Sequence, residues 1–245
     1  MLYINSYEEI RMEYTILSAS DDYALLSNSI GRYKERLCNI LSIDLKSQDF
    51  RLVALDSIQQ NLLSLTSYIR AFVKLQQLVS PDEFLKILNV GILTVEDYEK
   101  SGLVYKFPIE SLVTMVHFQI DSLFGQICKQ KETPRTGFYN RMKEVMEGTD
   151  IERDDKNNFQ NTLQCLAFFR NSFHNNGSHS MHRAKWEDGN EPAKGEVDRV
   201  FSQDGCKLEF KHNELITYNW RSAFLLIRGS VEVVQSLLIE LYKVS

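Results

Sequence analysis

Three segments of this chain repeat apolar residues in alternating steps of three and four, a period that restricts them to α-helices with one buried face. The most regular segment runs from Leu55 to Phe72. The other two span Ile109–Ile127 and Trp220–Leu241. Helices with such stripes bury them against one another, typically as a bundle. We therefore predict a mainly α fold: an up-and-down helical bundle with a small β-hairpin inserted before a long C-terminal helix.

The remaining elements follow from local signals. We expect two helices over 6–18 and 21–42, with an N-cap for the second at Ser20-Asp21-Asp22. Short helices are expected just after Pro81 and around Thr94, and residues 105–108 should be extended because proline restricts the residue before it. The polar residues 178–194 predict a loop. A hairpin is expected over 196–211, where an Asp-Gly turn joins two arms that each carry apolar residues.

The expected domain organisation has two parts. Residues 1–48 form an N-terminal helical extension, and residues 49–245 form the bundle domain. A polar break at 45–49 separates them. A chain of 245 residues is long enough to bury a sizeable hydrophobic core.

Composition indicates a globular protein in the cytoplasm. Apolar residues make up 43% and charged residues 25% of the chain, and the net charge of −5 argues against a protein that coats nucleic acid electrostatically. We expect neither a signal peptide nor a membrane span, since no run approaches the roughly 20 apolar residues that a span needs. The four cysteines are far apart and lack a Cys-x-x-Cys pair, which favours reduced thiols.

Polar side chains are concentrated near the C-terminal end of the predicted apolar helix that contains Arg170. Arg170 lies on its apolar stripe, where burying an unpaired guanidinium is costly. His174 follows four residues later on the same surface, and Asn171 adds an amide. Asn175, Asn176 and Gly177 are typical of a helix end. The rest of the stripe comprises Phe159, Leu163, Leu166 and Phe173.

An Arg-Asn pair on a helix, followed within about a turn by His, resembles the signature of the HEPN superfamily. The resemblance rests on Arg170, Asn171 and His174, and covers roughly residues 50 to 245. Three residues separate Arg170 from His174, fewer than is usual in the family's ribonucleases, and eight separate Arg170 from His179.

The resemblance implies a small all-α domain that works as a homodimer and cleaves RNA without a metal or other cofactor. Arg170 would hold the phosphate, His174 would take the 2′-hydroxyl proton, and Asn171 would orient the phosphate or His174. The two helices would face each other, so each site would be composite. Such proteins occur in toxin–antitoxin and phage-defence systems, which implies an antitoxin or defence effector as partner protein.

Two other functions stay open. The domain could have lost catalysis and serve as a binding or dimerisation module beside another effector protein. It could also be an unrelated helical scaffold. In that case Arg170 would bind a carboxylate from another helix, such as Asp121, and fasten the motif helix to its neighbours.

A basic segment before the motif is a candidate RNA-binding surface. Its cations are interleaved with Phe138 and Tyr139, and phosphate contact combined with base stacking holds single-stranded RNA. The alternative is a solvated loop followed by an ordinary surface helix. The basic residues are Lys129, Lys131, Arg135, Arg141 and Lys143.

The other histidines have structural interpretations. His117 lies beside the apolar residues Val113 and Ile120, so a satisfied histidine at the edge of the core is favoured over a catalytic one. His179 and His182 could join His174 around a metal. No acidic or thiol ligand has helical spacing to them, so we expect no metal site.

Overall fold

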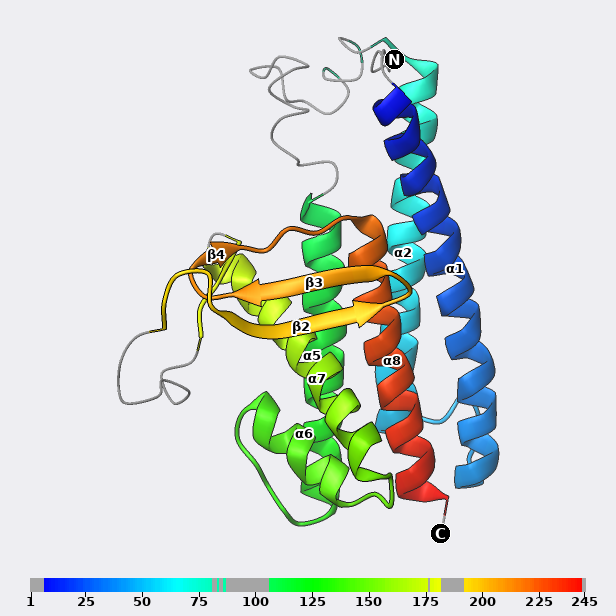
Figure 1. Cartoon of the computed structure of the whole chain (residues 1–245). Coiled ribbons are helices and arrows are strands. Elements are labelled where there is room, and N and C mark those ends of the chain that lie inside the picture. Colours follow the sequence, from blue (N-terminus) through cyan, green and yellow to red (C-terminus); the bar gives the residue numbers. More distant parts are fainter. Residues whose placement is uncertain are drawn as a thin grey trace.

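The computed structural model describes residues 7–80, 83, 86, 106–175, 177–181 and 192–243. The short helices expected after Pro81 and around Thr94, as well as His182, lie outside the described residues. The described chain is mainly helical, with two small two-stranded sheets (Figure 1). The predicted fold class is confirmed.

The first two helices form a long antiparallel hairpin (Figure 1). They are α1 (Tyr7–Leu41) and α2 (Phe50–Leu78), joined by the predicted polar break. In α2, Leu55, Ile58 and Leu62 of the predicted stripe are fully buried. The Asp49 side chain caps the helix by accepting a hydrogen bond from the Arg51 backbone N–H.

The prediction of two helices before residue 42 was wrong, because α1 runs unbroken through Ser20 and Asp21. These side chains bind the neighbouring helix instead of capping a new one. Arg70 of α2 donates from Nε to Ser20 Oγ over 3.1 Å and from Nη2 to Asp21 Oδ1 over 2.6 Å. Because Arg70 binds these side chains, they do not compete for the backbone hydrogen bonds of α1, and the helix continues.

The first helix shares its core with the last. Tyr23 of α1 is completely buried and packs edge-on against Trp220 and Phe224 of α8 (Trp220–Tyr242). Tyr33 donates a 2.7 Å hydrogen bond to the Gln235 carbonyl oxygen. The boundary expected at residue 48 therefore coincides with a loop between two helices of one core.

Three further helices complete the bundle: α5 (Lys106–Gln130), α6 (Phe138–Glu147) and α7 (Arg153–His174). Lys106 and Phe107, expected to be extended, belong to α5. Pro108 stands in the first turn, where the missing N–H of proline is not required for helical hydrogen bonding. The prediction of an extended segment there was wrong, because the turn tolerates this proline.

The β-hairpin lies across the bundle and contacts α7 and α8 (Figure 1). It consists of β2 (Val197–Gln203) and β3 (Cys206–Lys211), with Asp204 and Gly205 at φ +48° and +76° in the predicted turn. Phe201, Leu208 and Phe210 are buried. The predicted hairpin is therefore present, and its apolar residues pack on the bundle.

The segment predicted as loop from residue 178 contains a short strand. The strand β1 (Ser178–His179) pairs with β4 (Glu214–Leu215). This second sheet fixes the chain that follows α7 against the residues that precede α8, and it sets the position of His179.

Helix α8 is the central helix. Among the described residues it alone is long and apolar enough to cross a membrane, judged by length and composition. This differs from our expectation that no run was sufficiently apolar. However, 72% of its most apolar window is buried inside the chain. Its broad apolar surface therefore faces the helices and hairpin of its own bundle.

Candidate functional site

The predicted motif occupies the C-terminal end of α7. The helix ends at His174, and the backbone N–H groups of Asn175 and Gly177 both bind the Ser172 carbonyl oxygen. Gly177 has φ +85°, a conformation that glycine adopts without steric cost. Arg170 is half-buried, whereas Asn171 and His174 are exposed. The predicted helix end is confirmed.

The Arg170 guanidinium is held by an aromatic ring and an amide. It lies over the ring of Phe118 on α5, with 5.0 Å between Cζ and the ring centroid. Its Nη1 donates a 2.9 Å hydrogen bond to Asn171 Oδ1. Its Nε is buried without a hydrogen-bond partner among the described residues. Two weak contacts thus orient the guanidinium and leave its charge uncompensated.

The predicted alternative of an Arg170–Asp121 ion pair was wrong. Asp121 instead forms an ion pair with Arg141 on α6, with 2.8 Å between Asp121 Oδ1 and Arg141 Nη1. Within the described ranges, no carboxylate lies in ion-pair distance of Arg170. Arg141 thus joins α6 to α5, and Arg170 retains donors that face no anion among the described residues.

His117 of α5 lies on the buried side of this cluster. It is 6% exposed and packs against Phe138, with 4.6 Å between ring centroids. Its Nδ1 has no hydrogen-bond partner in the part of the chain that the structure describes. Burial, and secondarily the charge of Arg170, lowers the pKa of His117 to about 4, while Asp121 opposes the shift. The predicted burial is correct, but the side chain is not fully satisfied.

His179 belongs to a separate, buried pair. Its Nε2 lies 2.9 Å from Oδ2 of Asp198, and both side chains are at least 95% buried. The imidazole also packs against Phe168 of α7, at 4.6 Å between ring centroids. It is therefore held by β2 and the aromatic core, in contrast to the exposed His174.

The described residues contain no group of three or more His, Cys, Asp or Glu side chains placed to hold a metal ion. One imidazole nitrogen of His179 is already paired with the Asp198 carboxylate. Cys38, Cys128 and Cys165 are buried and Cys206 is half-buried, and none of the four forms a disulfide.

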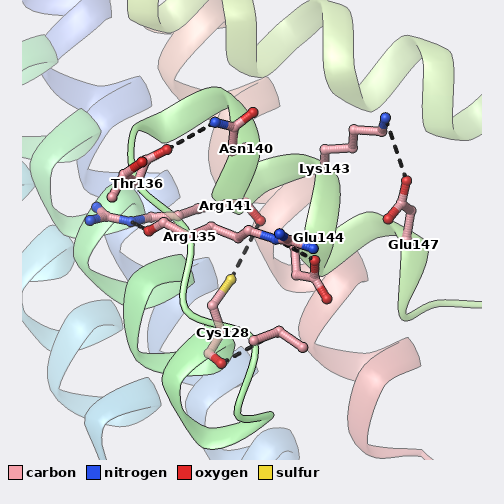
Figure 2. A network of polar contacts seen from close by, with 9 residues as sticks. Cys128, Arg135, Thr136, Asn140, Arg141, Lys143, Glu144 and Glu147 are labelled. Atoms are coloured by element: carbon pink, nitrogen blue, oxygen red, sulfur yellow. Dashed lines mark hydrogen bonds and ion pairs between the residues drawn. The ribbon is translucent and has the colours of Figure 1, made fainter.

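Ion pairs neutralise part of the charge of the basic segment around α6 (Figure 2). Arg135 Nε lies 2.9 Å from Glu144 Oε2, and Lys143 Nζ lies 3.7 Å from Glu147 Oε1. Arg141 donates from Nε to the Arg135 carbonyl oxygen in addition to its Asp121 pair. Three of the five predicted RNA-binding cations thus have carboxylate partners, which reduces the positive potential of this surface.

The basic segment adjoins the motif through its aromatic residues. Tyr139 is exposed and its hydroxyl accepts a 3.4 Å hydrogen bond from Gln160 of α7. Lys129 is exposed and lies 11 residues beyond Phe118 on α5, which corresponds to about 16 Å along the helix axis. Lys129 and Lys131 therefore lie at the far end of any surface that includes Arg170.

Several residues of this site could not be predicted from local sequence patterns. Phe118 and His117 follow the helical period of α5, and nothing in the sequence connects them to Arg170. Asp198 stands in a hairpin arm whose pairing with His179 depends on how the hairpin packs. Only the folded chain brings these groups together.

Comparison with known proteins adds little to this site. No family model and no solved structure matches the chain. A stretch is 27% identical over 123 residues to the DNA-directed RNA polymerase subunit beta'' of Cryptomeria japonica. The match covers 44% of this chain and 10% of that subunit. The chain thus spans about a tenth of that relative, and the match does not place it in a family.

Proposed function

We propose that the end of α7 binds an RNA phosphate and cleaves the adjoining phosphodiester without a metal, as a HEPN-like endoribonuclease. The observation that carries this proposal is the state of Arg170. A half-buried guanidinium, oriented by Phe118 and Asn171 and unpaired with any described carboxylate, stands one helical turn from an exposed imidazole.

The guanidinium suits the phosphate. Arginine can bind two phosphate oxygens at once through parallel N–H donors. Holding Arg170 in place before the substrate arrives lowers the entropic cost of that contact. Partial burial strengthens the attraction to an anion, because less water screens the charge. The same burial makes an unpaired cation costly without an anion.

His174 suits the proton transfer. Of the described histidines, His117, His179 and His212 are buried, so His174 alone is exposed. In the proposed reaction it takes the 2′-hydroxyl proton as the 2′-oxygen attacks phosphorus. The bond to the 5′-oxygen breaks, and that oxygen receives a proton. The products are a 2′,3′-cyclic phosphate and a 5′-hydroxyl.

The reaction needs both a base and an acid, and the described residues of one chain present a single exposed imidazole at this end of α7. A two-fold homodimer would supply the second imidazole and a second Arg170, which makes the site composite. Met115 and Phe118 on α5 offer an apolar surface beside Arg170 for such a contact, at 40% and 47% exposed. We also propose that the protein acts in the cytoplasm, in a toxin–antitoxin or phage-defence system. Its partner protein would be an antitoxin or a defence effector.

The same apolar surface favours a second candidate function. Met115 and Phe118 could receive another effector protein, and the domain would then be a catalytically inactive binding or dimerisation module. In that case the Arg170 guanidinium would bind a carboxylate of the partner at the rim of the interface.

Cleavage of tRNA and mRNA in EDTA tests the proposal. The wild-type protein should cleave, while Arg170→Ala and His174→Ala should each lower the rate at least 100-fold and retain wild-type helicity by circular dichroism. Arg153→Ala is the matched control, because Arg153 is an exposed cation in the first turn of the same helix. It should cleave at the wild-type rate.

The two candidate functions give different results in this assay. Full activity of both motif variants would eliminate the proposed chemistry. If the wild-type dimer does not cleave with any RNA tested and Phe118→Asp releases a bound partner, the binding-module function replaces it.

A further inference from the structure

A cavity of about 460 Å³ opens beside the end of α7 and is lined in part by Asn171, which also binds Arg170. It is lined by side chains of α7, β1 and the residues that follow each of them. Its volume is in the range of small-molecule sites. The lining residues that bear on its chemistry are Phe168, Asn171, Asn175, Ser178, His179 and Met181.

One part of this wall is aromatic and apolar. Phe168 and His179 lie with ring centroids 4.6 Å apart and their planes inclined by 36°. Met181, which is 8% exposed, extends the surface. Such a wall suits a planar aromatic ligand, because stacking on aromatic side chains is the usual way that proteins hold unpaired bases.

The polar part of the wall can read hydrogen-bonding edges. The exposed amides of Asn171 and Asn175 each combine donor and acceptor capacity. The Ser178 hydroxyl donates to the Asn175 carbonyl oxygen and retains its lone pairs. His179 uses Nε2 on Asp198, and no described residue hydrogen bonds to its Nδ1. Amide groups paired with base edges are a common basis of nucleobase recognition.

The described lining of this cavity carries no charged side chain, in contrast to the nearby Arg170 guanidinium. No Lys, Arg, Asp or Glu is among the described residues that line it. An uncharged group is therefore favoured inside, and a phosphate is favoured at the guanidinium. Asn171 joins the two, since its side chain lines the cavity and its Oδ1 accepts the Arg170 hydrogen bond.

We infer that this cavity binds the base of a nucleotide whose phosphate lies at Arg170. The inference rests on the proposed RNA chemistry at Arg170 and specifies its substrate as unpaired RNA. Only a base turned out of a helix can enter the cavity. The base contacts would also select among nucleotides, which phosphate contacts alone do not.

Isothermal titration calorimetry on the full chain tests the inference. The probes are the four nucleosides, their 3′-monophosphates, and ribose 5-phosphate, which offers a phosphate without a base. Ser180→Phe places a bulky ring at an exposed position of the cavity wall, and Asn175→Ala removes one exposed amide. Ser202→Phe makes the same substitution at an exposed position on β2 and is the matched control. Arg170→Gln weakens the phosphate contact alone.

At least one 3′-monophosphate should bind tenfold or more tightly than ribose 5-phosphate. Ser180→Phe should abolish that advantage and leave ribose 5-phosphate binding unchanged, and Asn175→Ala should reduce it at least threefold. Ser202→Phe should change neither. Arg170→Gln should weaken both phosphates, but not a free nucleoside.

Equal affinity for all phosphates, dependent on Arg170, would overturn the base site while the proposed function stands. A base preference that survives Ser180→Phe would also overturn it. Binding of a 3′-monophosphate that is lost in Ser180→Phe and unchanged in Arg170→Gln would support the base site, and it would count against the phosphate chemistry. Failure of every probe to bind would overturn the base site.

Discussion

Replacing His117 with phenylalanine should make the protein less sensitive to acid. The imidazole is 6% exposed, packs against Phe138 and has a pKa lowered to about 4, against an ordinary value of about 6.5. Between these two values the unfolded chain binds a proton that the folded chain does not. The contribution of His117 to the free energy of unfolding is therefore fully present above pH 6.5 and is lost as the pH falls toward 4.

The size of the effect follows from the two pKa values. A tenfold difference in proton affinity corresponds to about 1.4 kcal/mol, so the full loss amounts to about 3 kcal/mol below pH 4. At pH 4.5 the loss relative to pH 7 is about 2 kcal/mol. Phenylalanine preserves the aromatic packing and has no group to protonate. The other histidines are common to both proteins, so their titration cancels in the comparison.

Urea unfolding of wild type and His117→Phe at pH 7.0, 6.0, 5.0 and 4.5 measures this. The wild type should lose about 2 kcal/mol more than the variant across that range. Arg170→Met should reduce the loss, because the charge of Arg170 is the second cause of the lowered pKa. Parallel curves for wild type and His117→Phe would refute the reasoning. So would an NMR titration midpoint of native His117 near 6.5.

Further perturbations have defined outcomes. Gly205→Ala should lower stability by about 1 kcal/mol in urea unfolding, because Gly205 has φ +76°; an unchanged midpoint would contradict this. Phe169→Ala should cost about 3–5 kcal/mol, since the ring is fully buried; a loss below 1 kcal/mol would contradict its central packing. Lys129→Gln should weaken RNA retention on filters at low salt more than Arg135→Gln does, because Glu144 already neutralises Arg135; equal losses would contradict this account of the basic segment.

The helices of this fold were predictable because apolar period is a local property. The stripe of α2, the broad apolar surface of α8 and the Asp-Gly turn of the hairpin all appear as expected. The predicted break at Ser20 shows where local signals fail. Its cap-forming side chain is bound by Arg70, 50 residues later, and a local pattern contains no information about that contact.

The candidate site was predictable only in part. The helical spacing of Arg170 and His174 indicated a shared surface, and the structure has both on α7 near its end. The choice of Asp121 as a partner for Arg170 was wrong, since ion pairing between helices depends on their rotation and depth. The pairing of His179 with Asp198 likewise depends on how a hairpin docks, which no spacing in the chain encodes.

The chemistry of the RNA ends reports directly on whether Arg170 and His174 cleave RNA. Wild type and an Arg170→Ala/His174→Ala double variant should each be incubated with total RNA in EDTA, and the new termini identified by enzymatic labelling and mass spectrometry. The wild type should produce 2′,3′-cyclic phosphate and 5′-hydroxyl ends, and the double variant should produce none. Identical ends and rates from both proteins would contradict this expectation.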